Sequence, residues 1–445
     1  MQMLLHMYAI AFGVAVLIAI ATACWQKSVT KVWPVKATVF QQHYLVVYTV
    51  AYFADWLKGP YIYALYDSYG LTEDQIVLLF IVGFASSGVS GPFVGSLADK
   101  FGRKKMTLAY FLIYICSALC SPFENYSVLL LGRVFGGIGT SLLTSTLESW
   151  MVSEHLKHRY PHEMLDDTFS KATFLNSAAA VVSGIIAQIS VSYYGYLAPF
   201  MVALVPLVFG FVFCFFYWEQ DASTSERRVE FQKGLGMLDS NLWILGGTQS
   251  LFLGVMYTFV YLWTPALSSD PSLQHGLAFS TFMSMICIGT CIFKCFAAQV
   301  EMLPYIANSI AALSFVVSCV FIDNKVALFS AFVMFELSCG IMFPTYGSLR
   351  SMYIPDEHRT TIMNIFRIPL NVFVILLLVN KRFMSLQVMF GVCCLLHVIA
   401  CGMWYFFKHR VKVLDGKEYE MAQRHDSEED FGDIEEELES NSDEE

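Results

Sequence analysis

The chain contains thirteen predominantly apolar runs, each long enough to cross a bilayer as a helix. About 20 such residues span the hydrocarbon core, and backbone groups in lipid must be satisfied within the chain, which helices do. The runs lie at 3–24 and then near 42–66, 75–97, 105–121, 127–151, 169–192, 195–217, 242–266, 278–299, 302–322, 326–348, 360–380 and 385–407. We therefore predict an all-α polytopic membrane protein.

The longest polar connection, 218–241, separates six of these runs from six others. This spacing predicts two six-helix lobes, 42–217 and 242–407, joined by a cytoplasmic linker, 218–241. An extra transmembrane helix with its cytoplasmic connector, 1–41, precedes them, and an acidic tail, 408–445, follows.

The tail explains the acidic balance of the chain. Residues 426–445 contain 12 carboxylates and no Lys or Arg, and without them the net charge of −10 becomes +2. Blocks of like charge with little apolar content do not fold by themselves. We expect a disordered cytoplasmic tail that is accessible to cytoplasmic partners.

The distribution of Lys and Arg predicts the orientation in the membrane. With the loop at 99–105 on the cytoplasmic side, nineteen of these residues lie inside and three outside, which places the C-terminus in the cytoplasm. The first run has no Lys or Arg before it, whereas Lys27, Lys31 and Lys36 follow it. This favours a retained helix with an outside N-terminus over a cleaved signal peptide, although Ala21-Thr22-Ala23 resembles a cleavage site.

Composition argues against several function classes. Charged residues make up 14% of the chain, against about 25% in soluble domains, and no connection is long enough to fold as a soluble domain. The spans contain no HExxH motif or nucleophilic triad spacing, and the 12 cysteines show neither disulfide-framework nor zinc spacing. We expect no enzymatic activity, no cofactor, no metal and no nucleic-acid partner.

Charged residues inside spans are costly and usually face a bundle interior or a water-filled cavity. There are five cations and three anions: Asp55, Lys58, Arg133, Glu148, Lys171, Lys294, Glu336 and Arg367. The excess of positive charge favours an anionic solute. We expect solute contacts from Lys58, Arg133, Lys294 and Arg367, with Tyr52 and Gln249 as hydrogen-bond donors. Asp55 and Glu336 are the candidate partners of these cations in the empty site, or proton acceptors in a coupled cycle.

The first span of the first lobe has a polar face. Helical spacing places these residues on one side: Tyr44, Tyr48, Tyr52, Asp55 and Gly59. Gly59-Pro60 then breaks or kinks the helix, and transporters tend to bind solute beside such breaks. An alternative is that Asp55 and Lys58 only neutralise each other as an intrahelical pair.

The stretch GSLADKFGRKK, 95–105, resembles the loop signature of the major facilitator superfamily, between the second and third core spans. The matching residues are Gly95, Asp99, Gly102 and Arg103. The resemblance implies a cytoplasmic gate network built on Asp99 and Arg103, to which we add Glu148 as an interfacial lock. RxxxGxG at 133–139 resembles the fourth-helix motif of that superfamily. The second lobe has no comparable loop, so we expect a one-sided gate.

Further segments resemble the eukaryotic molybdate-anion transporter subfamily of that superfamily. They are ADWLKGPYIYALYDSYG (54–70), VYLWTP (260–265), ELSCGIMFP (336–344) and FRIPL (366–370). This resemblance implies a plasma-membrane importer of the molybdate oxyanion that works by alternating access. The alternatives are a transporter of another organic anion or a sugar-like solute, and a non-transporting membrane sensor or scaffold.

The odd number of spans predicts the sides on which the two termini lie. Epitope tags at Met1 and Glu445 should be accessible from opposite sides of the membrane in intact cells. Antibody accessibility before and after selective permeabilisation measures this. Two cytoplasmic tags would contradict retention of the first helix.

Overall fold

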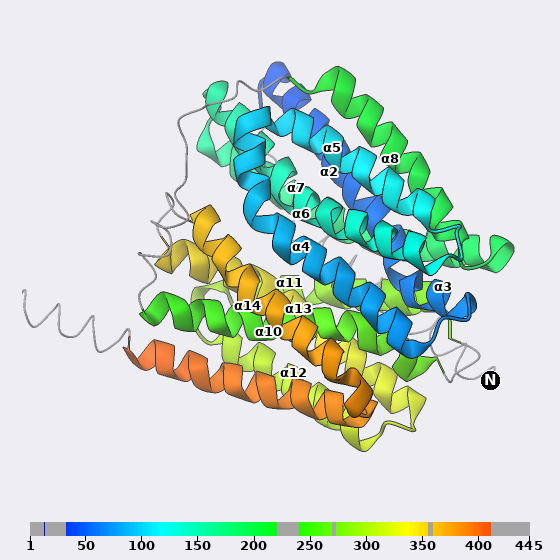
Figure 1. Cartoon of the computed structure of the whole chain (residues 1–445). Coiled ribbons are helices and arrows are strands. Elements are labelled where there is room, and N and C mark those ends of the chain that lie inside the picture. The colour runs from blue at the N-terminus through cyan, green and yellow to red at the C-terminus, as the bar shows by residue number, and fades with distance from the viewer. Residues whose placement is uncertain (1–12, 14–32, 220–239, 269–272, 355–358, 411–445) are drawn as a thin grey trace, which may run out of the picture.

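The computed structural model describes residues 13, 33–219, 240–268, 273–354 and 359–410. Within these ranges the regular structure is entirely helical, which confirms the all-α prediction. The main helices, drawn in Figure 1, are α2 Val35–Lys58, α4 Glu73–Phe101, α5 Arg103–Cys120, α6 Tyr126–Lys157, α7 His162–Tyr194, α8 Ala198–Tyr217, α10 Ser240–Leu267, α11 His275–Cys295, α12 Leu303–Val320, α13 Lys325–Tyr353, α14 Arg359–Val379 and a final helix, Leu386–Arg410.

The polytopic prediction is also confirmed. In the described ranges, nine of the helices are long and apolar enough to cross a membrane. The predicted helix at 3–24, apart from Gly13, most of the linker 218–241 and most of the tail 408–445 lie outside the described residues. The extra helix and the disordered tail therefore stay predictions.

The helices form two bundles that lie side by side in Figure 1. The first contains α2 to α8, and the second contains α10 to α14 and the final helix. α7 packs on α11 and α4 packs on α14 where the bundles meet. The bundles converge at the end that carries α3 (Ile62–Ser68), here called the α3 end, and diverge toward the end where the 218–241 connection leaves, here called the linker end.

The helix break predicted at Gly59-Pro60 is confirmed. α2 ends at Lys58, a 3₁₀ turn covers Gly59–Tyr61, and α3 continues from Ile62. Pro60 supplies no N–H and its ring crowds the preceding turn, so the regular i→i−4 hydrogen bonds of an α-helix cannot continue across this residue. The break leaves Lys58 in the last turn of α2, where the helix dipole favours a cation.

Glycines set how closely the helices of each bundle approach. A Cβ on Gly137 of α6 would lie 2.3 Å from the carbonyl oxygen of Gly83 in α4. In the second bundle, a Cβ on Gly340 of α13 would lie 2.2 Å from the carbonyl oxygen of Ile286 in α11. The obstacle is backbone in both cases, so only glycine fits. The two bundles thus use the same close approach at corresponding helices.

Gly137→Ala should destabilise the protein by about 1–3 kcal/mol, because the new methyl group must push α4 and α6 apart. The thermal unfolding midpoint of the detergent-solubilised protein measures this. Gly391→Ala is the matched control, since its Cβ would meet nothing within 4 Å. Equal midpoints for Gly137→Ala and the parent chain would contradict the packing argument.

Candidate functional site

A cavity of about 290 Å³ lies in the first bundle. It is lined by Tyr44, Tyr48, Tyr52, Leu143, Thr144, Leu147, Glu148, Phe169, Ala172 and Thr173. These residues come from three helices, α2, α6 and α7. The predicted common face of Tyr44, Tyr48 and Tyr52 is confirmed, since all three side chains line the same cavity. We call this space the tyrosine cavity.

The polar groups of the tyrosine cavity are hydroxyls and a single carboxylate, that of Glu148. The ring centroids of Tyr48 and Tyr52 lie 4.6 Å apart. Tyr44 is fully buried, and its hydroxyl has no hydrogen-bond partner in the described part of the chain. Glu148 is exposed to the cavity, and Arg350 of α13 acts on it electrostatically from the second bundle. Arg350 was not among the site residues predicted from the sequence.

A second polar group lies further along α2, around Tyr114 of α5. The Tyr114 hydroxyl donates to Asp55 Oδ1 at 2.8 Å and lies 2.9 Å from the Thr140 hydroxyl. The ammonium of Lys58, which is 7% exposed, sits 3.7 Å from the centroid of the Tyr114 ring. Among the described residues, Asp55 and Lys58 form no ion pair within 4.0 Å, and both contact Tyr114 instead. Asp55 and Lys58 therefore do not form the direct intrahelical ion pair of the alternative interpretation.

Arg133 of α6 completes this group. Its Nε donates to the Leu79 carbonyl at 3.1 Å, and its guanidinium carbon lies 5.3 Å from the centroid of the Phe80 ring. A Cβ on Gly83 would lie 2.4 Å from Arg133 Nη2, so the glycine makes room for the guanidinium. Lys58 interacts electrostatically with both Asp55 and Arg133. We call Asp55, Lys58 and Arg133 the cation cluster, because two cations accompany one carboxylate.

The other predicted solute contacts lie in the second bundle. Gln249 of α10 is 6% exposed, and its Oε1 has no hydrogen-bond partner among the described residues. Glu336 of α13 is also buried, whereas Lys294 is exposed in the last turn of α11. The side chain of Arg367 lies outside the described residues. The structure thus groups Asp55, Lys58 and Arg133, and it places Tyr52 at the tyrosine cavity. Gln249, Lys294 and Glu336 lie on helices of the second bundle, and their contact with solute stays a prediction.

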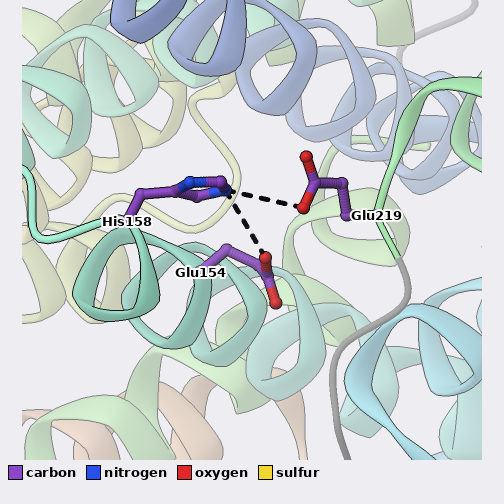
Figure 2. Close-up of side chains that lie close together, drawn as sticks. All are labelled: Glu154, His158 and Glu219. Atoms are coloured by element: carbon purple, nitrogen blue, oxygen red, sulfur yellow. Dashed lines mark ion pairs between the residues drawn. The ribbon is translucent and has the colours of Figure 1, made fainter.

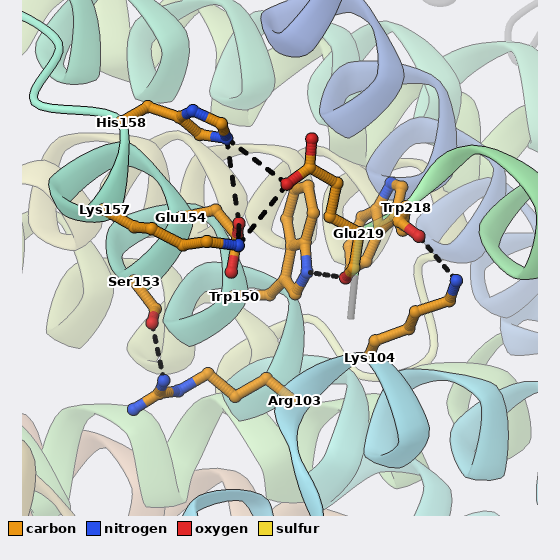
Figure 3. Close-up of polar contacts among 9 residues, drawn as sticks. All are labelled: Arg103, Lys104, Trp150, Ser153, Glu154, Lys157, His158, Trp218 and Glu219. Carbon is orange, nitrogen blue, oxygen red and sulfur yellow. Dashed lines mark hydrogen bonds and ion pairs between the residues drawn. The ribbon is translucent and has the colours of Figure 1, made fainter. Parts of the chain in front are cut away.

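The predicted gate residues lie at the linker end. Gly95 is part of α4, and Gly102 separates α4 from α5 with φ at +92°, a conformation that favours glycine. Arg103 Nη1 donates to the Ser153 hydroxyl at 2.7 Å, which ties this loop to α6 (Figure 3). The side chain of Asp99 lies outside the described residues.

A carboxylate–cation cluster lies beside this loop, at the end of α6. Figure 2 shows His158 pointing toward Glu154 and Glu219, at 3.8 and 3.5 Å. The ligand atoms of these three residues lie within 4.8 Å of one another, a spacing that a metal ion could use. However, the Lys157 ammonium already lies 2.8 Å from Glu154 and 3.4 Å from Glu219 (Figure 3). The Lys157 ammonium already forms ion pairs with both carboxylates, and the cluster joins α6 to the chain after α8.

A hydrogen-bonded group joins the two bundles at the α3 end. The Tyr61 hydroxyl donates to Gln188 Oε1 at 2.7 Å. The Gly276 N–H, in the first turn of α11, lies 3.0 Å from the Tyr61 hydroxyl oxygen and 3.1 Å from Gln188 Oε1. N–H groups in a first turn have no partner within their own helix, so side chains of the first bundle cap a helix of the second. We call Tyr61, Gln188 and Gly276 the interbundle cap.

An ion pair between Glu73 of α4 and Lys381, in the loop after α14, joins the bundles at the same end. Neither this pair nor the interbundle cap was predicted from the sequence. In the sequence, the signal for the interbundle cap is Gln188, a polar residue inside an apolar run.

Comparison with known proteins gives three findings. A family model described as sugar transporters with twelve transmembrane segments matches residues 5–335. The molybdate-anion transporter of Xenopus tropicalis is 32% identical over 427 residues, which cover 89% of this chain and 93% of that protein. The molybdate-anion transporter of Xenopus laevis is 33% identical over 352 residues, which cover 75% of this chain and 77% of that protein. The crystal structure of a D-xylose–proton symporter superposes with a TM-score of 0.66 at 12% identity, covering 84% of this chain and 98% of that one, which shows a shared fold.

Gln188→Ala should speed amide hydrogen exchange at the start of α11 roughly fivefold, because Gly276 loses an acceptor that contributes about 1 kcal/mol. Mass spectrometry of a peptide that covers 275–283 measures the rate. Ser192→Ala, in α7 like Gln188, is the matched control, since its hydroxyl donates to the backbone carbonyl of Gln188 within α7. Unchanged exchange in Gln188→Ala would contradict the interbundle cap.

Proposed function

The chain belongs to the major facilitator superfamily, in the family described as sugar transporters with twelve transmembrane segments, and it is similar to the molybdate-anion transporters. On that premise we propose that it imports a small oxyanion, molybdate, across the plasma membrane. It is a multi-pass membrane protein of a transporter family. As a secondary transporter it has no catalytic step of its own.

The observation that carries this proposal is the cation cluster inside the first bundle. Two cations accompany one carboxylate there, and in the described structure Lys58 makes no ion pair within 4.0 Å. Unbalanced positive charge in a low-dielectric interior is costly unless a counter-charge arrives. A tetrahedral dianion supplies that charge and accepts charge-assisted hydrogen bonds from lysine and arginine.

The tyrosine cavity offers a path toward the cluster. Tyr44, Tyr48 and Tyr52 follow one face of α2, and Lys58 comes six residues after Tyr52, roughly 9 Å further along the helix axis. Hydroxyl donors along this face can replace part of the hydration shell of an oxyanion that moves between the two regions. In the second bundle, Gln249, Lys294, Glu336 and Arg367 remain proposed contacts.

We assign the linker end to the cytoplasm, because the positively charged loops gather there, and the C-terminus lies on the same side. The lobes 42–217 and 242–407 then rock against each other around the site. The interbundle cap and the pair Glu73–Lys381 support an arrangement that is closed toward the outside. The loop with Asp99 and Arg103 closes the cytoplasmic side in the opposite arrangement.

A second candidate is a transporter of a sugar-like solute. The tyrosine cavity favours it, because aromatic rings and hydroxyls suit a polyhydroxylated molecule and Glu148 does not attract an anion. An uptake screen over oxyanions and sugars separates the two candidates. A membrane sensor or scaffold would move neither kind of solute.

Purified protein in liposomes should take up labelled molybdate. Lys58→Gln should raise the molybdate concentration at half-maximal uptake about tenfold, because the charge-assisted hydrogen bond that it removes contributes roughly 1.5–3 kcal/mol. Lys36→Gln is the matched control, since Lys36 is exposed at the start of the same helix. No molybdate uptake by the parent protein would contradict the proposed substrate.

The double variant Asp55→Asn with Lys58→Gln distinguishes a binding role from a structural one. If Lys58 binds solute, the double variant regains thermal stability while uptake stays weak. If the two residues only balance each other, stability and uptake recover together, because neither charge is left unpaired in the interior.

A further inference from the structure

Asp55 and Lys58 have opposite charges and lie three residues apart in α2, yet they do not pair. Side chains at this spacing are neighbours on the surface of a helix, and opposite charges attract strongly in a low-dielectric interior. In the part of the chain that the structure describes, the two form no ion pair with each other, and both contact Tyr114 of α5 instead. The position of Tyr114 therefore decides whether the two charges meet.

We propose that Tyr114 is a positioning residue, which keeps Lys58 available for the solute anion by holding the carboxylate of Asp55 away from it. This inference rests on the proposed function and adds to it a residue that sets the affinity of the anion site. Tyr114 acts through Lys58 and needs no contact with the solute.

The hydroxyl and the ring of Tyr114 have separate parts in this arrangement. The hydroxyl donates to Asp55 Oδ1 at 2.8 Å, so a neutral group satisfies the carboxylate. The ammonium of Lys58 lies 3.7 Å from the centroid of the ring. A π face attracts a cation without cancelling its charge. Lys58 is thus held inside the first bundle with its charge still open to an anion.

The ring of Tyr114 is held in place by α6. Tyr114 is 1% exposed. A Cβ on Gly139 would lie 2.0 Å from Cδ2 of Tyr114, so the ring fits only because this residue is a glycine. The hydroxyl of Thr140 lies 2.9 Å from the phenol oxygen. These contacts fix the phenol that holds Asp55, and they give the last glycine of the motif at 133–139 a place beside the cation cluster.

Tyr110, one turn earlier in α5, shows what a purely structural tyrosine does at this helix contact. It is fully buried, and its ring centroid lies 4.8 Å from that of Tyr114. Its hydroxyl donates at 3.1 Å to the backbone carbonyl of Ala51 in α2. Both tyrosines therefore join α5 to α2 by one hydrogen bond, and only the bond of Tyr114 involves a charged side chain.

Loss of the Tyr114 hydroxyl should allow the ion pair to form. In Tyr114→Phe the ring under Lys58 remains, whereas Asp55 loses its donor and turns to the ammonium as the nearest replacement. An incoming anion must then break this pair before it binds Lys58. The affinity for the anion should fall although no group that binds the anion has been removed.

The first test measures exchange of labelled for unlabelled molybdate by the full-length protein in liposomes. Tyr114→Phe should raise the molybdate concentration at half-maximal exchange about tenfold, equivalent to about 1.4 kcal/mol, while the maximal rate changes little. When Asp55→Asn is already present, Tyr114→Phe should change this concentration less than about twofold, because no carboxylate is left to pair with Lys58. Tyr110→Phe is the matched control and should bind molybdate as the parent protein does.

The second test needs no solute. The unfolding midpoints of Asp55→Asn, Lys58→Gln and the double variant give the coupling between the two residues as a non-additive shift. This shift should be larger when Tyr114→Phe is also present, because the two charges are then in contact. An equal shift with and without Tyr114→Phe would overturn the inference, whatever the protein transports.

The outcomes separate this inference from the proposed function. No molybdate exchange by the parent protein overturns the proposed function, and the midpoints then still decide whether Tyr114 separates the two charges. Exchange by the parent protein with an unchanged half-maximal concentration in Tyr114→Phe overturns the positioning role alone. The same increase with and without Asp55→Asn also overturns it, because a loss of packing alone would act equally in both backgrounds.

Discussion

The constraint on which the rest of this structure depends is the cost of charge inside a membrane. A charged side chain in the spans must find a partner, a π system or water. Lys58 rests on the Tyr114 ring, whose hydroxyl in turn binds Asp55, and Arg133 donates to a backbone carbonyl of α4. These contacts fix the positions of α2, α4, α5 and α6 relative to one another. The cation cluster therefore holds net positive charge in a defined place of the first bundle, and the proposed anion site rests on this charge.

Helix breaks and glycines make that arrangement sterically feasible. Pro60 interrupts the backbone hydrogen bonds of α2, so the helix ends at Lys58. The ammonium of Lys58 therefore belongs to the last turn of α2. Gly83 makes room for the guanidinium of Arg133, and its carbonyl lies against Gly137. A methyl group at either glycine would disturb the same contact between α4 and α6 that carries the arginine. The packing motif and the buried charge are thus one structural unit.

The sequence predicted the spans, the break at Gly59-Pro60 and the shared face of Tyr44, Tyr48 and Tyr52, because each depends on local periodicity or on a single residue's stereochemistry. It did not predict that Asp55 and Lys58 meet on Tyr114, since that contact joins α2 to α5 across 59 residues of chain. The interbundle cap was missed for the same reason. The predicted solute contacts come from both bundles, and their meeting in one site stays a prediction. Which side chains of two lobes face each other depends on packing angles that periodicity within one helix does not contain.

The two ends of the molecule are held by contacts of different kinds. At the linker end, three contacts lie within the first bundle. They are the hydrogen bond Arg103–Ser153, the ion pair Glu154–Lys157, and the stacked rings of Trp150 and Trp218, whose centroids are 3.7 Å apart. These contacts hold the first bundle together at this end and do not depend on the second bundle. At the α3 end, the hydrogen bonds of Gly276 and the pair Glu73–Lys381 run between the bundles. Because this end lies near the membrane surface, water can replace each bond that breaks, and the net cost per bond is about 0.5–1.5 kcal/mol. A few such bonds hold the bundles together at this end, and their modest net cost is compatible with the rocking of the lobes that we propose.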